Sequence, residues 1–270
     1  MRGLGIENVD IKYVSEPVPE GSKVVLRSPV GSTVHGTSVF DQDDRDEMAL
    51  VIEPPEYIVG HANWETTLMR TQLERDRSGP GDLDLVVHSM RKYVRLAMAG
   101  NPTILLLLYS PPIDSAWQGR ELLACREWFL SKRAGTAFLG YMDAQRKRLA
   151  GEQGGRHGAM RVELVEKYGF DTKYAGHIVR LGLQGIELLT TGRLTLPMEE
   201  VDRKLVVDVR TGKVTLPQVL TLASGLQAQL ENAIKNSALP DECDQTRVNK
   251  WLASLYIESW VHVVRYGKLR

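Results

Sequence analysis

The sequence has little of several features that would point to particular classes of protein. Its two cysteines, Cys125 and Cys243, lie far apart and belong to no metal-binding or redox spacing, which favours a reducing compartment. Lysine plus arginine and aspartate plus glutamate both total 34, so no excess of positive charge indicates a nucleic-acid partner. Any contact with nucleic acid must therefore depend on local patches.

The chain also lacks a long hydrophobic run and a detectable internal repeat. Its densest apolar stretch, Ile104 to Tyr109, is much shorter than the roughly 20 residues of a membrane-spanning helix. The first ten residues contain no apolar segment of the kind found in secretion signals. We therefore expect a cytoplasmic protein with no membrane partner.

The order of predicted elements indicates an α+β fold. Short β-like runs separated by Gly, Pro and Asp fill the first third, at Val24–Leu26, Met48–Ile52 and Leu83–Val87. Apolar residues at helical spacing predict a helix from Ser89 to Ala99, which Gly100-Asn101-Pro102 ends. We expect a small mixed β-sheet in a core of residues 1–115, a mainly helical domain in 116–270, and an active site between them.

Helical patterns dominate after about Gln118. Helices are predicted at about Pro217–Asn236 and Thr246–Tyr266. The β-branched run that begins at Leu205 and continues past Thr211-Gly212-Lys213 to Leu216 predicts a small hairpin. The glycine-rich segment 151–158, which carries Arg156, fits either a plain connection or a lid.

The most informative stretch runs from Gly31 to Asp46. Gly31 and Ser32 open a tight turn, where backbone N–H groups can approach a polyphosphate because a glycine has no Cβ. Asp44 and Asp46 follow at a spacing of two, which directs both side chains to one face at the mouth of a strand. The sequence therefore predicts a phosphate cradle beside a pair of carboxylates.

Nucleotidyl transfer commonly uses two divalent ions about 3.5–4 Å apart, which need several hard oxygen ligands. Asp84 is the natural third carboxylate, because it interrupts an apolar strand, and Asp82 is the reserve choice. An aspartate-rich loop alone is more often a solvated turn. A calcium loop of the EF-hand type is disfavoured, because the expected glycine and distal glutamate are absent.

These residues carry a resemblance to a known family. Gly31-Ser32 through Asp46, the run from Asp84 to Leu96, and the following Gly100-Asn101-Pro102 resemble nucleotidyltransferases of the DNA polymerase beta superfamily. The similarity is to the branch associated with RNA repair in bacteria and their phages. It implies that Asp44, Asp46 and Asp84 bind Mg²⁺ or Mn²⁺, and that Gly31 and Ser32 hold the triphosphate of an NTP.

The register of the acidic pair has an alternative. In the commoner form of the signature the pair lies nearer the glycine-serine turn, so Asp41 and Asp43 compete for the role. Asp44 and Asp46 are preferred because a strand-like run follows them directly.

Basic residues at two places are candidates for contacts with the nucleotide. Lys173, His177 and Arg180 have the spacing i, i+4 and i+7, which places them on one helix face, within a stretch that also loosely resembles the family. Lys92, on the helix after Asp84, is a candidate for neutralising phosphate. The alternative at both places is a solvated polar stripe.

The function predicted from these features is metal-dependent transfer of a nucleoside monophosphate from an NTP to a hydroxyl acceptor, with release of pyrophosphate. RNA is the candidate acceptor. Two alternatives stay open: a toxin-like or protein-modifying nucleotidyltransferase, and a catalytically degenerate protein that binds nucleotide or RNA. The second would predict a lost carboxylate, whereas every candidate carboxylate is present.

Overall fold

A computed structural model of the chain describes residues 4–39, 43–74, 76, 78–152 and 160–266. Its centre is a six-stranded mixed sheet with the strand order β1-β4-β5-β3-β2-β6. Strands β3 and β5 pair in parallel, and the other neighbours are antiparallel. The strands are β1 Tyr13–Val14, β2 Lys23–Pro29, β3 Arg45–Ile52, β4 Thr66–Arg70, β5 Leu83–Ser89 and β6 Asp114–Ser115.

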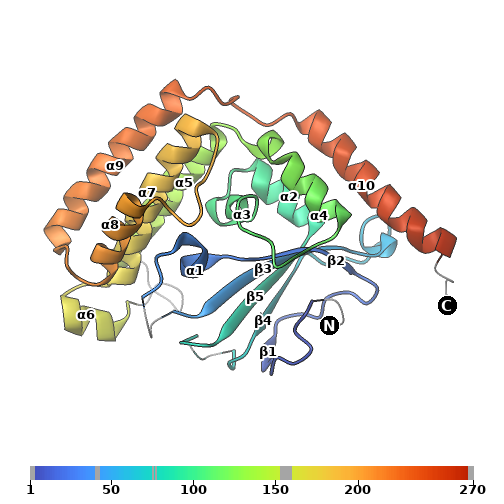
Figure 1. Cartoon of the computed structure of the whole chain (residues 1–270), viewed down its shortest axis with the longest axis horizontal. Helices are drawn as coiled ribbons and strands as arrows, with labels where there is room; N and C mark the ends of the chain where they lie inside the picture. The colour runs from blue at the N-terminus through green and yellow to red at the C-terminus, as the bar shows by residue number, and fades with distance from the viewer. Residues whose placement is uncertain (1–3, 40–42, 75, 77, 153–159, 267–270) are drawn as a thin grey trace.

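Most of the helices follow the sheet along the chain, and they gather on one side of it (Figure 1). Two short 3-10 helices are also present: Pro55–Tyr57 lies between β3 and β4, and Arg126–Phe129 lies between two of the α-helices. The helices are α1 Gly31–His35, α2 Met90–Met98, α3 Pro102–Leu106, α4 Trp117–Ala124, α5 Arg133–Leu149, α6 Val162–Tyr168, α7 Thr172–Thr191, α8 Glu200–Arg210, α9 Leu216–Asn236 and α10 Gln245–Tyr266. The expected α+β fold, with a small mixed sheet and a mainly helical remainder, is confirmed.

The two faces of β3 belong to different hydrophobic cores, because side chains alternate along a strand. Met48, Leu50 and Ile52 pack with the helices, whereas Ala49 and Val51 pack with β4, β5 and the N-terminal segment. Asp46 is two residues before Met48 and therefore lies on the same face of β3. Its side chain therefore points to the helical side of the sheet.

Local signals explain why several elements begin and end where predicted. Ser89 caps α2 by accepting a hydrogen bond from the Lys92 amide at 3.0 Å, and Asn101 caps α3 in the same way. Thr215 and Gln218 form a capping box at the start of α9. The helices predicted at 89–99, 217–236 and 246–266 are therefore present as α2, α9 and α10.

The predicted hairpin at 205–216 is wrong, because this segment forms α8 and the start of α9. Val206 and Val209, three residues apart, are buried against α7. Lys204 and Asp208 form an i,i+4 ion pair on the solvent-facing side of the helix. The β-branched residues favoured a strand locally. Packing at helical spacing overrides that preference.

The described residues contain no helix with the length and apolar character required to cross a membrane. The proposed boundary near residue 115 falls between β6 and α4, although one hydrophobic core includes residues from both sides of it. The division into 1–115 and 116–270 stays a prediction. Arg156 and the centre of the glycine-rich segment lie outside the described residues.

Candidate active site

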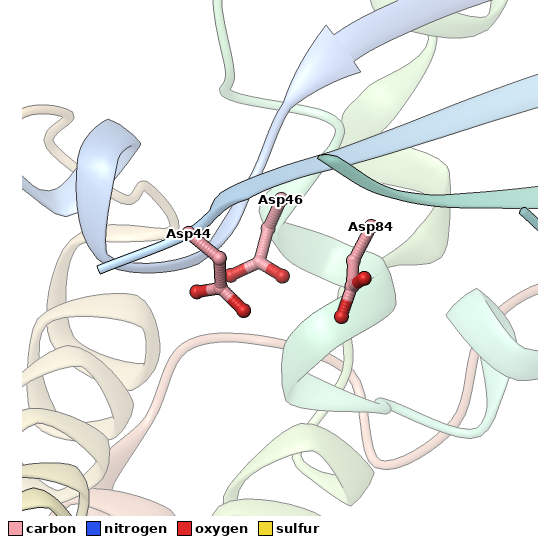
Figure 2. Close-up of side chains that lie close together, drawn as sticks. All are labelled: Asp44, Asp46 and Asp84. Carbon is pink, nitrogen blue, oxygen red and sulfur yellow. The ribbon is translucent and has the colours of Figure 1, made fainter. Parts of the chain in front are cut away.

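Three aspartates converge on the helical side of the sheet. Asp46 on β3 and Asp84 on β5 are direct partners in the parallel ladder, and Asp44 precedes Asp46 by two residues. One carboxylate oxygen from each lies within 4.8 Å of the others, and all three residues are half-buried. Figure 2 shows the three side chains pointing into the same space. Parallel pairing thus joins residues that are about 40 positions apart in the sequence.

Gly31 brings α1 directly beside this cluster. The backbone N–H of Val30 donates to the carbonyl oxygen of Asp46 at 2.9 Å, and Gly31 adopts a φ of 70° in the left-handed region. A Cβ at Gly31 would run into the carboxylate of Asp46. Only glycine fits this position without displacing Asp46. Ser32 follows at the start of α1, where its hydroxyl accepts from Ser38 at 3.4 Å.

The electrostatics of the cluster favour the uptake of positive charge. Burial raises the pKa of Asp46 to about 7, and the negative charges of Asp44 and Asp84 add to this effect, while Lys173 opposes it. Like charges this close disfavour full ionisation. Carboxylate oxygens are also the ligands that hard divalent cations prefer. The donor set and its mutual repulsion therefore both fit a divalent cation.

The carboxylate of Asp84 is held by a polar network from the neighbouring strand and loop. Arg70 on β4 donates to Oδ1 at 3.0 Å, and Gln72 donates to the same oxygen at 2.8 Å. Ser78 donates to Oδ2 at 2.7 Å. The Arg70 guanidinium also reaches the carbonyl of Asp76 at 3.0 Å, which ties the loop between β4 and β5 to the site. These contacts fix the orientation of Asp84.

Asp43 is turned away from the cluster toward a different partner. Its Oδ1 accepts from Arg210 at 2.6 Å, and its Oδ2 accepts from the backbone of Val39 at 2.7 Å. Burial acts to raise the pKa of Asp43, but the hydrogen bond and charge of Arg210 outweigh it, so the pKa is lowered. Asp41 lies outside the described residues. Among the described residues, the structure brings together Asp44, Asp46 and Asp84, and gives Asp43 an arginine partner.

The basic residues predicted on one helix face lie on α7, close to α1 and to Asp43 of the acidic loop, the connection between α1 and β3. The Lys173 ammonium is 3.7 Å from Asp43 Oδ1, and its charge partly opposes the rise in the pKa of Asp46 that burial causes. Burial, and then the charge of Arg180, lowers the pKa of His177 well below its ordinary value. Burial, followed by the charge of Arg210, lowers the pKa of Arg180 to about 10. This side of the site therefore carries a surplus of positive charge.

Arg180 also fixes the buried side chain of His35 beneath α1. Its guanidinium donates to His35 Nε2 at 2.9 Å, and the Gln184 amide lies 3.1 Å from Nδ1. Burial, with the charge of Arg180, lowers the pKa of His35 well below its ordinary value. His35 is therefore a neutral packing residue in the link between α1 and α7.

Lys92 and Asp82 occupy different surroundings from the cluster. Lys92 lies in the first turn of α2, beyond the opposite end of β5 from Asp84, and pairs with Glu65 at 2.7 Å. Asp82 accepts from the Gly79 amide at 2.9 Å and from the Thr71 hydroxyl at 3.0 Å. The structure does not bring Lys92 to the three aspartates.

Two arginines at the site were not found from the sequence. Arg70 ends β4, whose sequence, Thr-Thr-Leu-Met-Arg, does not alternate polar and apolar residues, although burial alternates along the strand in the structure. Arg210 lies in the segment predicted as a hairpin, which concealed its position at the end of a helix beside Asp43.

Two comparisons with known proteins found similarities to this chain. A family model described as the RNA repair pathway DNA polymerase beta family matches residues 9–254. A crystal structure of a nucleotidyltransferase-like protein from Exiguobacterium sibiricum 255-15 is 13% identical, covering 78% of this chain and 69% of that chain, with a TM-score of 0.28. A search of curated proteins gave no match.

Proposed function

Because the chain belongs to the RNA repair pathway DNA polymerase beta family, we propose that it transfers a nucleoside monophosphate from an NTP to a hydroxyl of RNA. The observation that carries this proposal is the convergence of Asp44, Asp46 and Asp84, whose ligand oxygens lie within 4.8 Å of one another. A degenerate binding protein would have no reason to keep three carboxylates together at a cost in mutual repulsion.

Asp44, Asp46 and Asp84 would hold Mg²⁺ or Mn²⁺ in this proposal, because all three offer hard oxygen ligands from a half-buried position. Divalent ions bound there would stabilise the charge that develops on the transferred phosphate and on the leaving pyrophosphate. The chain's own contribution is to fix the three carboxylates. Strand pairing fixes Asp46 and Asp84, and Arg70 sets the orientation of Asp84.

In the proposed reaction the acceptor oxygen forms a bond to the α-phosphorus of the NTP. The bond from this phosphorus to the bridging oxygen of the β-phosphate breaks, and pyrophosphate leaves. The hydroxyl proton passes to Asp84 or to a neighbouring carboxylate of the cluster.

The triphosphate would lie between the start of α1 and the basic face of α7. Gly31 and Ser32 supply backbone amides in a turn that no Cβ obstructs, and Lys173 lies beside the acidic loop. Arg180 adds to the positive charge on this side, whereas the lowered pKa of His177 leaves its imidazole neutral. A polyanion would relieve the repulsion among these cations.

The test is to incubate the purified protein with each α-labelled NTP, Mg²⁺ or Mn²⁺, and total RNA, and to separate the labelled products. Labelling of RNA that depends on metal and on one or more NTPs supports the proposal. Asp84→Asn is the matched control, because it keeps the size of the side chain and removes its charge. Label on protein instead of RNA would correct the acceptor, and no transfer to any acceptor would overturn the proposed function.

A further inference from the structure

The three aspartates of the site differ in how the sheet supports them. Asp46 and Asp84 are paired residues of β3 and β5, and the Val30 amide also donates to the carbonyl of Asp46. The pairing of β3 with β5 begins one residue after Asp44, where the Arg45 amide donates to the carbonyl of Asp82 at 2.8 Å. Asp44 therefore needs a second support on its N-terminal side.

Arg210, at the end of α8, provides a contact at that place. Arg210 is buried, with only 4% of the residue's surface exposed. Its Nη2 donates to Asp43, the residue before Asp44. Nη1 donates to the backbone carbonyl of Thr37, which follows α1. One guanidinium thus holds both ends of the connection between α1 and β3. Asp43 adds a third contact, because it accepts from the Val39 amide.

The position of Arg210 is itself determined by packing. Its aliphatic stem lies on the α7 backbone at Gly176, where an added Cβ would be 2.6 Å from Arg210 Cγ. Any larger residue at Gly176 would push the stem away. The rigid fork of a guanidinium can bridge two acceptors, whereas an ammonium acts as a single point charge.

We infer that Arg210 is a positioning residue that holds Asp44 in its metal-binding place, by fixing Asp43 and Thr37 at the two ends of the acidic loop. This inference deepens the proposed function and rests on the metal-binding role of the three aspartates. It assigns a task within the site to α8, a helix that contributes none of the three ligands.

A purely electrostatic role for Arg210 predicts the opposite effect on metal affinity. Removing a positive charge near three carboxylates strengthens their attraction for a divalent cation. Losing a positioning contact weakens metal binding, because the ligand at Asp44 is then no longer held in place. Changes to such supporting contacts typically weaken metal affinity or activity by roughly 10–100-fold. The sign of the change in affinity therefore separates the two roles.

The experiment measures Mn²⁺ affinity and amide hydrogen exchange in the wild-type chain, Arg210→Met and Arg210→Lys. We expect both variants to bind Mn²⁺ roughly 10–100-fold more weakly, with faster exchange in the loop and at the start of β3. Lys204→Met is the matched control on the same helix, because Lys204 is exposed and pairs with Asp208. It should bind Mn²⁺ as the wild type does.

Wild-type or tighter Mn²⁺ affinity in Arg210→Met would overturn the inference, and wild-type affinity in Arg210→Lys would overturn the part of it that requires a guanidinium to bridge Asp43 and Thr37. If Arg210→Met fails to fold, Arg210→Lys and Asp43→Asn carry the same test. A wild-type chain that binds Mn²⁺ but transfers no nucleotide would refute the proposed function and leave the positioning test intact. A wild-type chain that binds no Mn²⁺ would overturn both.

Discussion

Single residues at the site show two different ways of placing a carboxylate. Asp46 and Asp84 come from paired positions of a parallel ladder, so the sheet itself sets the distance between their backbones. Asp44 lies just before the strand and depends on its neighbours in the loop. We therefore expect substitutions at Asp46 to act directly on metal binding, and substitutions around Asp44 to act through position.

Replacing Asp46 with Asn should abolish nucleotide transfer and leave the fold intact. The amide is nearly isosteric with the carboxylate but neutral, so it keeps the packing against Gly31 and weakens the binding of a hard cation. The expected loss is roughly two to three orders of magnitude in kcat, as for one preorganised electrostatic contact. Single-turnover kinetics would measure it, with circular dichroism to check the fold. Transfer at the parental rate by the folded variant would refute the role of Asp46.

Replacing Gly31 with Ala should impair both stability and activity. The left-handed conformation costs a residue with a Cβ about 1–2 kcal/mol, and the new methyl group would displace the Asp46 carboxylate. Gly140→Ala is the control, because Gly140 lies within α5 with open space around its Cβ position. Urea denaturation should show a loss for Gly31→Ala and no loss for Gly140→Ala. Equal stabilities would contradict the steric explanation.

Among whole elements, α10 is attached to the sheet partly through a buried acid. Glu53 follows β3 and is fully buried, and the Tyr256 hydroxyl of α10 donates to it at 2.8 Å. Trp260 on the same helix donates to the Glu53 carbonyl at 3.0 Å. Burial raises the pKa of Glu53 above its ordinary value of 4.5, although Tyr256, Ser89 and Arg91 partly oppose this.

The raised pKa predicts a pH dependence of stability. The folded chain binds more protons at Glu53 than the unfolded chain does, so this residue's contribution to stability falls as pH rises from 4.5 through the folded pKa. Glu53→Gln removes the titration and keeps an acceptor for Tyr256. We expect the variant to gain stability over the wild type as pH rises from 4.5 to 8, measured by urea denaturation. A difference that is constant across this range would contradict the explanation.

The α8 segment shows the limit of reading elements from the sequence. Its β-branched residues, including Val206 and Val207, gave the prediction of a strand, and the following Thr211-Gly212-Lys213 resembled a hairpin turn. The same residues have a helical spacing of buried positions. Local propensity and periodicity disagreed here, and packing against α7 favoured the helix.

For the whole molecule, metal binding should appear as stabilisation of the folded state. A ligand that binds only the folded chain stabilises it by about 2.7 kcal/mol at 100 times its Kd. We expect Mg²⁺ or Mn²⁺ to raise the Tm of the wild type and to have little effect on Asp46→Asn. Asp82→Asn is the matched control, because Asp82 is a half-buried aspartate of the same strand region that lies outside the cluster and accepts from the Gly79 amide instead. An equal rise in all three proteins would show that the metal acts elsewhere.

The sequence alone determined the residue types that the site requires and several of the elements that carry them. The alternation of Asp44 and Asp46, the lone Asp84 on an apolar strand, and the Gly31-Ser32 turn are local patterns, so they could be read directly. The caps of α2 and α9 are local in the same sense. Such features depend on residues only a few positions apart.

Only the tertiary structure decided which distant residues meet. Parallel pairing placed Asp46 beside Asp84, antiparallel pairing placed Arg70 beside Asp84, and the packing of α8 on α7 brought Arg210 to Asp43. It also placed Lys92 with Glu65, away from the aspartates. The physical reason is that strand order and helix packing depend on the burial of whole apolar faces, a property that no local pattern contains.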